Sequence, residues 1–370
     1  MELERYIEEL RQLVNTDSGT ATLSGVAKMA EMMRQKYRDM GWHAEMVDLG
    51  DDVGPGVWAT NKPDAEQFDV LLFGHMDTVF PEGTAAARPF TVEGNIARGP
   101  GVADMKSGLL SIVYALRALD QATLDRLAIG VVMNASEEVA SDRARDWIAD
   151  CSQKSRCVLV FEGARADGSL VKARKGISSI QIDFKGVAAH AGNDPQKGRS
   201  AVVEMAHWIQ ALAGLNDYAA GTTVNVGTVN GGTASNVVPD HASMMVDVRF
   251  WKTSEAEKIE QALATLQSKT FTPDITVTVT RLAFKPAMEV SGDTKGLMTT
   301  VEEIGAAMHL PIRWSAVGGG SDANISASLG IPTLDGLGPI GANYHGEAEY
   351  MQLDSVMPRI QLAVQLLQRL

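Results

Sequence analysis

The sequence contains little cysteine and no long apolar run. Its two cysteines, Cys151 and Cys157, flank a basic stretch without metal-site spacing, so a disulfide framework is excluded and a reducing compartment fits. No apolar run approaches the ~20 residues that a membrane-spanning helix needs, so no membrane segment is expected. Basic residues are also in deficit, because 33 lysines and arginines against 46 aspartates and glutamates give a net charge of −13. That charge repels nucleic acid and anionic lipid, and neither is expected as a partner.

The N-terminal residues lack the pattern of a secretory signal. Ile7, Leu10, Leu13 and Val14 recur at helical spacing, which predicts an amphipathic helix instead. We therefore expect a cytoplasmic protein. The length of 370 residues exceeds the size at which a single core usually stops growing, which favours two domains.

The order of the predicted helices and strands locates those domains. From about residue 23 to 160, helices alternate with strands, which predicts an α/β domain with a mostly parallel sheet. Over roughly residues 176 to 282 the order becomes β-α-β-β-α-β, as in a ferredoxin-like α+β unit. The α/β pattern then resumes. We expect a catalytic domain built from residues 1–175 and 286–370, with residues 176–285 inserted as a second domain.

Polar residues of metal-binding type stand in five short segments. Each segment follows an apolar run or a glycine-rich turn, which is where catalytic loops lie in a parallel sheet. The segments are G-H-M-D-T at 74–78, D-M-K at 104–106, S-E-E at 136–138, F-E-G at 161–163 and N-Y-H-G at 343–346.

These segments supply a ligand set for two zinc ions. Zinc takes imidazole and carboxylate ligands, and two-metal hydrolases hold their ions about 3.5–4 Å apart, so one carboxylate must bridge them. We predict that His75 and Glu162 bind one metal, that Glu138 and His345 bind the other, and that Asp104 bridges both.

Two further carboxylates complete the predicted chemistry. Asp77, two residues after His75, is placed to accept the other ring N–H of that histidine and fix its tautomer. Glu137 remains as the base that takes the proton of the attacking water and passes it to the leaving amine. Taken singly, His-X-Asp occurs by chance, Glu137-Glu138 is an ordinary solvated acidic pair, and His345 could be a surface or core histidine. Their joint occurrence favours the metal site.

Three more motifs lead to a family resemblance. Together with A-H-A-G at 189–192, G-T-A-S-N at 232–236 and G-G-G-S-D at 318–322, the five segments resemble the aminoacylase/carboxypeptidase G family of co-catalytic zinc peptidases. Among its members the sequence is most similar to the glutamate carboxypeptidases. The resemblance covers essentially the whole chain and implies the same ligands, Glu137 as the catalytic base, and two Zn²⁺ per chain, with Co²⁺ or Mn²⁺ as alternatives.

The resemblance also implies roles for the inserted domain. That domain would be a lid and the interface of a homodimer, and His190 would reach the partner's active site to steady the carbonyl oxygen. From the residues alone, His190 lies in a small-residue turn that favours a structural role. Asn236 and the backbone at Gly320 match substrate-binding positions.

Two basic residues are further candidates for substrate binding. Arg249 lies on the strand face opposite Met244, Val246 and Val248, so we expect it to be free for a substrate carboxylate. Lys285 stands before Pro286, where related enzymes carry arginine, and could meet a second, acidic side chain.

We therefore expect a hydrolase that cleaves the amide bond to a C-terminal amino acid with a free carboxylate, in a small peptide or an N-acyl amino acid. An N-acyl-amino-acid deacylase, similar to acetylornithine deacetylase or desuccinylase, and a dipeptidase are the alternatives. A nucleotide-binding enzyme fails on spacing, because Met105 stands where the phosphate loop needs glycine and Asp104 where the dinucleotide fingerprint needs one. A non-catalytic protein is disfavoured because Glu137 and all the ligands are retained.

Overall fold

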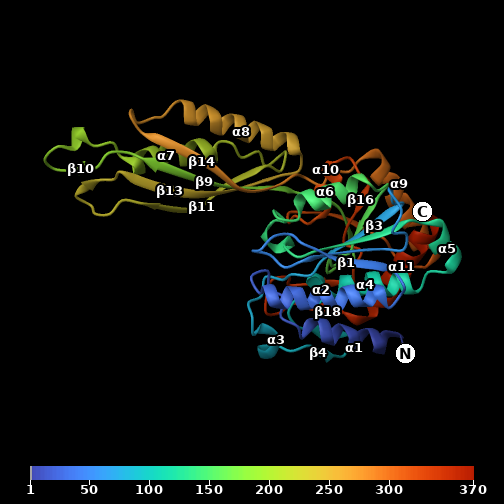
Figure 1. Ribbon diagram of the computed structural model, residues 1–370. Helices are drawn as coiled ribbons and strands as arrows, with labels where there is room; N and C mark the ends of the chain where they lie inside the picture. Colours follow the sequence, from blue (N-terminus) through green and yellow to red (C-terminus); the bar gives the residue numbers. More distant parts are fainter. Residues whose placement is uncertain (1) are drawn as a thin grey trace. The chain divides into compact units, whose positions relative to one another are not determined.

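The computed structural model describes residues 2–370, and the chain forms two compact units (Figure 1). The first unit contains the chain up to Ala173 together with Glu289–Val317 and Ser321–Leu370. The second contains Arg174–Met288 together with Gly318–Gly320. The predicted limits of the inserted domain, 176–285, lie close to these, but the glycine turn at 318–320 was not expected to group with that domain.

A six-stranded sheet forms the centre of the first unit. Its inner strands are buried and mostly apolar, as expected for parallel strands covered on both faces, although β3 ends in His75 and β6 in Asn134. Strands β6, β3, β7 and β16 run parallel, and β2 and β1 extend the sheet in antiparallel order. In sheet order the strands are β1 (His43–Val47), β2 (Gly56–Thr60), β6 (Ile129–Asn134), β3 (Val70–His75), β7 (Val158–Val160) and β16 (Thr333–Leu334).

Helices cover both faces of this sheet. In Figure 1, α2 and α4 lie on one face, and α6 and α10 lie on the other. The N-terminal helix α1 buries Leu10, Leu13 and Val14, which confirms the predicted amphipathic helix. Within residues 2–370, no helix is both long enough and apolar enough to cross a membrane. The longer helices are α1 (Glu2–Val14), α2 (Leu23–Arg38), α4 (Ser107–Arg117), α6 (Arg145–Gln153), α9 (Gly292–Ala307) and α11 (Val356–Arg369), and α10 (Ala323–Ser328) is a short helix.

Short elements connect these layers. They lie mainly in the loops that follow the central strands and in the segment before α11. These elements are α3 (Thr84–Ala87), α5 (Gln121–Arg126), β4 (Thr91–Glu93), β5 (Ile96–Arg98), β8 (Leu170–Arg174), β15 (Trp314–Val317), β17 (Gly341–Ala342), β18 (Tyr350–Gln352) and the single turns η1 (Val102–Lys106), η2 (Glu137–Val139) and η4 (Leu353–Ser355). A further turn, η3 (Pro195–Lys197), belongs to the second unit.

The second unit is a four-stranded antiparallel sheet with two helices. Ile180, Ile182 and Phe184 are buried and alternate with more exposed residues, so the two-residue period correctly identified β9 as a strand buried on one face. The sheet order β11-β13-β9-β14 is that of a ferredoxin-like unit, as expected. Its elements are β9 (Gly176–Lys185), β10 (Ala189–His190), α7 (Ala201–Ala213), β11 (Thr223–Gly231), β12 (Val237–Val238), β13 (His241–Phe250), α8 (Thr253–Ser268) and β14 (Thr276–Lys285).

Candidate active site

His75 is the last residue of β3 and is almost fully buried. Its Nδ1 lies 2.9 Å from the backbone carbonyl of Asp77 and 3.5 Å from the Asp77 carboxylate. Nδ1–H therefore donates to Asp77, mainly to the carbonyl rather than to the carboxylate that the sequence had indicated. This bond leaves the lone pair on Nε2 of His75. Nε2 lies 3.1 Å from Oδ1 of Asp104 and 3.5 Å from Oε1 of Glu162.

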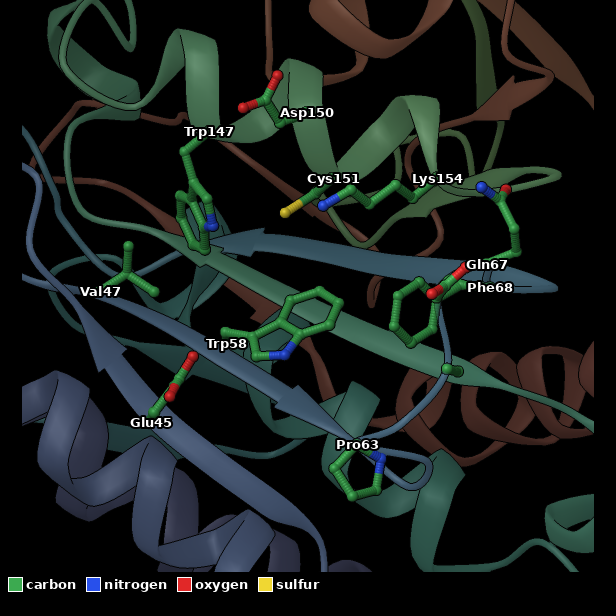
Figure 2. A pocket seen from close by; sticks show the side chains of 12 residues that line it. Glu45, Val47, Trp58, Pro63, Gln67, Phe68, Trp147, Asp150, Cys151 and Lys154 are labelled. Atoms are coloured by element: carbon green, nitrogen blue, oxygen red, sulfur yellow. The ribbon is translucent and has the colours of Figure 1, made fainter.

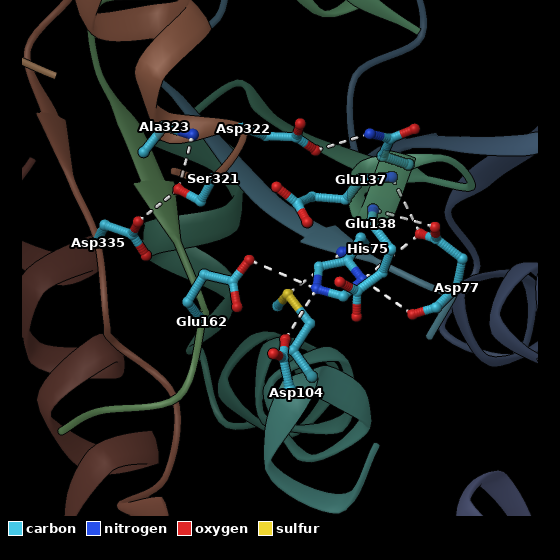
Figure 3. A network of polar contacts seen from close by, with 12 residues as sticks. His75, Asp77, Asp104, Glu137, Glu138, Glu162, Ser321, Asp322, Ala323 and Asp335 are labelled. Atoms are coloured by element: carbon cyan, nitrogen blue, oxygen red, sulfur yellow. Dashed lines mark hydrogen bonds and ion pairs between the residues drawn. The ribbon is translucent and has the colours of Figure 1, made fainter. Parts of the chain in front are cut away.

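Asp104 faces a histidine with each of its oxygens. Its Oδ1 lies 3.1 Å from Nε2 of His75, and its Oδ2 lies 3.1 Å from Nε2 of His345. The same nitrogen of His345 lies 3.1 Å from Oε2 of Glu138. The donors thus form two groups, one around His75 and one around His345, that share a single carboxylate. Figure 3 shows the His75 group.

His345 reaches the cluster from the loop between β17 and β18. Its backbone has a φ of 62°, a conformation that is uncommon for a residue with a side chain and typical of functional loops. The ring is half exposed, unlike the buried His75. Donor atoms of His75, Asp104 and Glu138 also lie within 4.8 Å of one another, so the two groups adjoin.

The carboxylates of this cluster strongly perturb each other's pKa. Burial and the neighbouring negative charges of Asp104 and Glu137 raise the pKa of Glu162 well above its usual range, although His75 opposes the shift. Burial likewise raises the pKa of Glu138. Asp104 and Glu138 accept hydrogen bonds from the ring of His345 and raise the pKa of that histidine to about 10. The site therefore accumulates negative charge that a cation would neutralise.

The loop that carries Glu137 and Glu138 is held by Asp77. The Asp77 carboxylate accepts the backbone N–H of Glu137 at 3.1 Å and that of Glu138 at 3.2 Å. It also accepts the hydroxyl of Thr20 at 2.7 Å. In Figure 3, Glu138 extends toward His75 while Glu137 extends toward Glu162, so the adjacent carboxylates point in different directions. Asp77 thus fixes the backbone of Glu138, a predicted ligand, and of Glu137, the predicted base.

Two supporting carboxylates had not been predicted. Asp322 accepts hydrogen bonds from Asn134 at 2.9 Å and from Ser141 at 2.5 Å, which braces the Glu137 loop from its other side (Figure 3). Asp322 belongs to a motif that the sequence had singled out, but its partners were not readable from it. Glu349 is buried and accepts the backbone N–H of Asp104 at 3.0 Å. No local pattern marks Glu349, because its partner is 245 residues away.

The second unit brings His190 and Asn236 together. β10 carries His190 and pairs with β12, and the Asn236 carbonyl accepts the N–H of Ala191 at 2.9 Å. The ring of His190 is exposed, and its Nδ1 accepts the backbone N–H groups of Gly192 and Asn193, each at 3.1 Å. Because Nδ1 is an acceptor, a neutral His190 carries its proton on Nε2, where it can be donated.

Arg249 and Lys285 lie at the other end of the same sheet. Both are aligned with Ile177 at the start of β9, whereas β10 follows Lys185 at the end of β9. Figure 1 places β10 beyond that end of the sheet. The separation along β9 is about 26 Å, at ~3.3 Å per residue. Arg249 and His190 of one chain therefore cannot hold the same small substrate.

The guanidinium of Arg249 is not free, which corrects the expectation from strand alternation. Asp247, two residues earlier on the same face, accepts from Nε at 2.8 and 3.1 Å and from Nη2 at 2.9 Å. Nη1 has a longer contact of 3.5 Å with the carbonyl of Gly318. Alternation predicts the face that a side chain occupies, but that face also carried a residue of opposite charge.

Lys285 and Gly320 also differ from the expected picture. Lys285 is 3% exposed, so it is not a cation open to solvent at the surface of the second unit. The carbonyl of Gly320 lies 3.5 Å from Nη1 of Arg174, which also donates to the carbonyl of Gly319 at 3.2 Å. The glycine turn thus directs carbonyl groups at an arginine of its own unit.

A pocket of about 760 Å³ lies at the edge of the central sheet of the first unit (Figure 2). Trp58 of β2, Trp147 of α6 and Phe68 form its apolar walls, and Glu45 and Asp150 stand at its rim. None of the predicted site residues lines it, so this pocket takes no part in the chemistry of the metal cluster.

Comparisons with known proteins show the family of the chain. A model of the peptidase dimerisation domain matches residues 172–274. Carboxypeptidase G2 of Pseudomonas sp. (strain RS-16) is 31% identical over 374 residues, which cover 98% of this chain and 88% of that protein. The chain belongs to the M20 family of metallopeptidases. The resemblance drawn from the motifs is therefore confirmed.

Other similar proteins have names that indicate different activities. Acetylornithine deacetylase of Klebsiella pneumoniae (strain 342) is 29% identical over 266 residues, which cover 67% of this chain and 68% of that protein. The structure of aminopeptidase PepT from Bacillus cereus matches with a TM-score of 0.77 at 24% identity, over 99% of this chain and 98% of that one, which shows a common fold. The family is thus shown, whereas the substrate is not determined by similarity.

As an M20 metallopeptidase the chain is a metal-dependent hydrolase, and its site fits that chemistry. Imidazole nitrogens and carboxylate oxygens are the donors that zinc prefers. The observation that decides the fit is the shared carboxylate of Asp104, which faces one histidine with each oxygen at 3.1 Å. Such a carboxylate suits two adjacent cations better than one.

Proposed function

We propose that this M20 peptidase is a two-zinc exopeptidase that cleaves the amide bond to a C-terminal amino acid with a free carboxylate. Co²⁺ and Mn²⁺ are the alternative metals. The observation that carries the proposal is the division of the donors around Asp104. His75 and Glu162 would hold one ion, and Glu138 and His345 would hold the other. Bound zinc would supply Lewis-acid polarisation of the scissile carbonyl and of water.

Glu137 acts as the general base in this proposal. Its backbone is fixed by Asp77, and its carboxylate is turned away from that of Glu138 (Figure 3). It takes a proton from the attacking water and delivers it to the nitrogen of the leaving amino acid. Loss of the charge on Glu137 would remove this transfer without removing a metal ligand.

His190 donates from Nε2 to the carbonyl oxygen of the substrate, where negative charge develops. The hydrogen bonds to its Nδ1 support this tautomer. His190 and Asn236 lie at one end of the sheet of the second unit, and Arg249 lies at the other. If one active site uses all three, two chains must contribute, and we therefore propose a homodimer formed through the second unit.

Arg249 is the proposed partner of the substrate α-carboxylate. Asp247 holds the Nε and Nη2 side of the guanidinium and so orients it, and Nη1 has only the long contact with Gly318. The backbone at Gly320 and the amide of Asn236 are the other proposed contacts. The burial of Lys285 removes the main reason to expect an acidic side chain on the substrate, so the proposal requires the α-carboxylate alone.

A comparison of acid and amide substrates tests this function. An N-acyl amino acid and its α-amide should be offered to the zinc-loaded enzyme with the same acyl group. We expect kcat/KM to fall at least a hundredfold for the amide, because Nη1 of Arg249 would lose the carboxylate oxygen that it is proposed to bind. Equal rates would contradict recognition of a free carboxylate. If the enzyme hydrolyses neither compound, the proposed exopeptidase activity is contradicted.

A deacylase that removes an acyl group from the α-nitrogen is the second candidate. The similarity to acetylornithine deacetylase favours it. The two activities share the same bond type and differ only in the acyl part that the enzyme accepts. The cytoplasm remains the proposed location, supported by two cysteines that form no disulfide.

A further inference from the structure

A pocket of about 300 Å³ lies within the first unit, and none of the predicted site residues lines it. Its volume is at the lower end of the ~300–1,000 Å³ range of ligand pockets, so it suits a small molecule. Three parts of the chain contribute to its wall: the turn at Asp167 and Gly168, the segment 310–313, and residues between Ile340 and Arg359.

Arg359 lines this pocket, and its guanidinium is only partly satisfied by the protein. The residue is 4% exposed, and Nη2 donates to the carbonyl of Gly168. Nη1 is buried and has no hydrogen-bond partner among residues 2–370. Burial lowers the pKa of Arg359 to about 10, and no carboxylate of the described chain opposes that shift. A buried cation without an anionic partner is costly, so an anion that reaches it is stabilised.

Hydrogen bonds join the parts of the chain that form the pocket. The backbone N–H of Leu170 donates to the carbonyl of Arg313 at 2.9 Å, which ties the turn to the segment 310–313. The bond from Arg359 to the carbonyl of Gly168 ties α11 to the same turn. The pocket is therefore preformed, and a ligand has little of its wall to order on binding.

The charges around the pocket indicate which anion it takes. Arg313 is exposed, and its Nη1 lies 3.5 Å from the carbonyl of Asp167, which is long for a hydrogen bond. The Asp167 carboxylate accepts the N–H and the hydroxyl of Ser169 at 3.0 and 2.7 Å, and Asp354 is exposed. Two guanidinium groups thus favour an anion, whereas the two carboxylates disfavour one that carries more than a single charge.

The remaining wall has an apolar part. It is formed by Leu310, Pro311, Ile340 and Pro358. A ligand with an aliphatic body would cover these side chains, which adds a hydrophobic contribution that an inorganic anion does not make.

We propose that this pocket binds a small organic monocarboxylate, with its carboxylate on the guanidinium groups of Arg313 and Arg359 and its aliphatic body on the apolar wall. The planar guanidinium of arginine matches the two oxygens of a carboxylate. The site is separate from the metal cluster, so the inference does not rest on the proposed exopeptidase.

Methyl NMR of the zinc-loaded enzyme, in a buffer without carboxylate or phosphate, tests this site. Ile340 lines the pocket, and the signal of its labelled δ1 methyl can be assigned with Ile340→Val. Butanoate should shift this signal in a saturable manner. Butanamide has the same shape without the charge and should bind at least about tenfold more weakly. Phosphate should also bind more weakly than butanoate, because it has no aliphatic body and a higher charge.

Matched variants assign the binding to the two arginines. Arg359→Lys keeps the charge but removes the planar group, and it should weaken the binding of butanoate about tenfold. Arg313→Gln should weaken it about threefold, since an exposed charge contributes less. Arg369→Gln is the control, because Arg369 ends the same helix, contacts Glu303 and does not line the pocket.

Three results with the wild type would overturn the proposal: no saturable shift of the Ile340 signal, equal binding of butanamide, or tighter binding of phosphate than of butanoate. Equal affinity for butanoate in Arg313→Gln and Arg369→Gln would also overturn it. That comparison decides the case in which Arg359→Lys does not fold.

Discussion

The carboxylate of Glu349 accepts the backbone N–H of Asp104 at 3.0 Å, in the interior of the first unit. It also accepts the N–H groups of Gly101 at 3.0 Å and Ala103 at 2.8 Å. One buried side chain therefore satisfies three backbone donors in the loop that ends at the proposed bridging ligand. Glu349 thus holds the backbone that carries Asp104.

The first prediction follows from this contact. Glu349→Gln keeps the shape of the side chain but presents an amide N–H₂ to backbone donors, so at least one of the three bonds is lost. We expect metal affinity to fall by about 10–100-fold, as for other residues that orient a ligand. Glu347→Gln is the control, because Glu347 is exposed on the same loop. Chelator competition measures the affinity, and equal affinities of the two variants would contradict the role of Glu349.

The second prediction separates the adjacent glutamates. Glu137→Gln should retain the metal content of the wild type while turnover falls by at least the ~10²–10⁴ typical of general-base loss. Glu138→Gln should lose metal, because its carboxylate faces His345. Elemental analysis combined with steady-state kinetics checks both. Near wild-type turnover in Glu137→Gln would remove that residue from the mechanism.

The third prediction concerns pH and metal binding. Hydrogen bonds to Asp104 and Glu138 raise the pKa of His345 to about 10 in the absence of metal, so the free site is protonated at neutral pH. Metal binding must displace that proton, so affinity should rise with pH between 6 and 8, by up to about tenfold per pH unit for each proton released. Calorimetry in buffers of different ionisation enthalpy counts the protons. An affinity independent of pH in this range would show that His345 is not a ligand.

The fourth prediction tests the contribution of two chains. His190→Ala should lower kcat much more than it raises KM, because its proton is used in the transition state. Mixed dimers of His190→Ala and Glu137→Gln should recover activity, since one site would then contain both a base and a donor. Dimers of each variant alone serve as controls. No recovery in demonstrably mixed dimers would place His190 and Glu137 of the same chain in one site.

Much of the fold was readable from periodicity, as β9 and α1 illustrate. Ile180, Ile182 and Phe184 alternate with polar residues, and the buried face of β9 follows directly. The ligand-type residues were recognisable because His75 ends a buried strand, and Glu138 and Glu162 each follow one closely.

Contacts between residues far apart in the chain could not be predicted from the sequence. Glu349 acts on a loop 245 residues away, and no periodicity encodes such a partner. The pairing of Arg249 with Asp247 was missed for a different reason, since alternation places both on one face without indicating that they bond. The same applies to His75, whose Nδ1 lies closer to the Asp77 carbonyl than to its carboxylate.

Anomalous diffraction from crystals of the zinc-loaded enzyme is the most direct test of a shared bridging carboxylate. We predict two zinc peaks per chain about 3.5–4 Å apart. One peak should lie near His75 and Glu162, and the other near His345 and Glu138, with an oxygen of Asp104 on each. A single peak per chain, or two peaks with Asp104 bound to only one, would contradict the two-metal site.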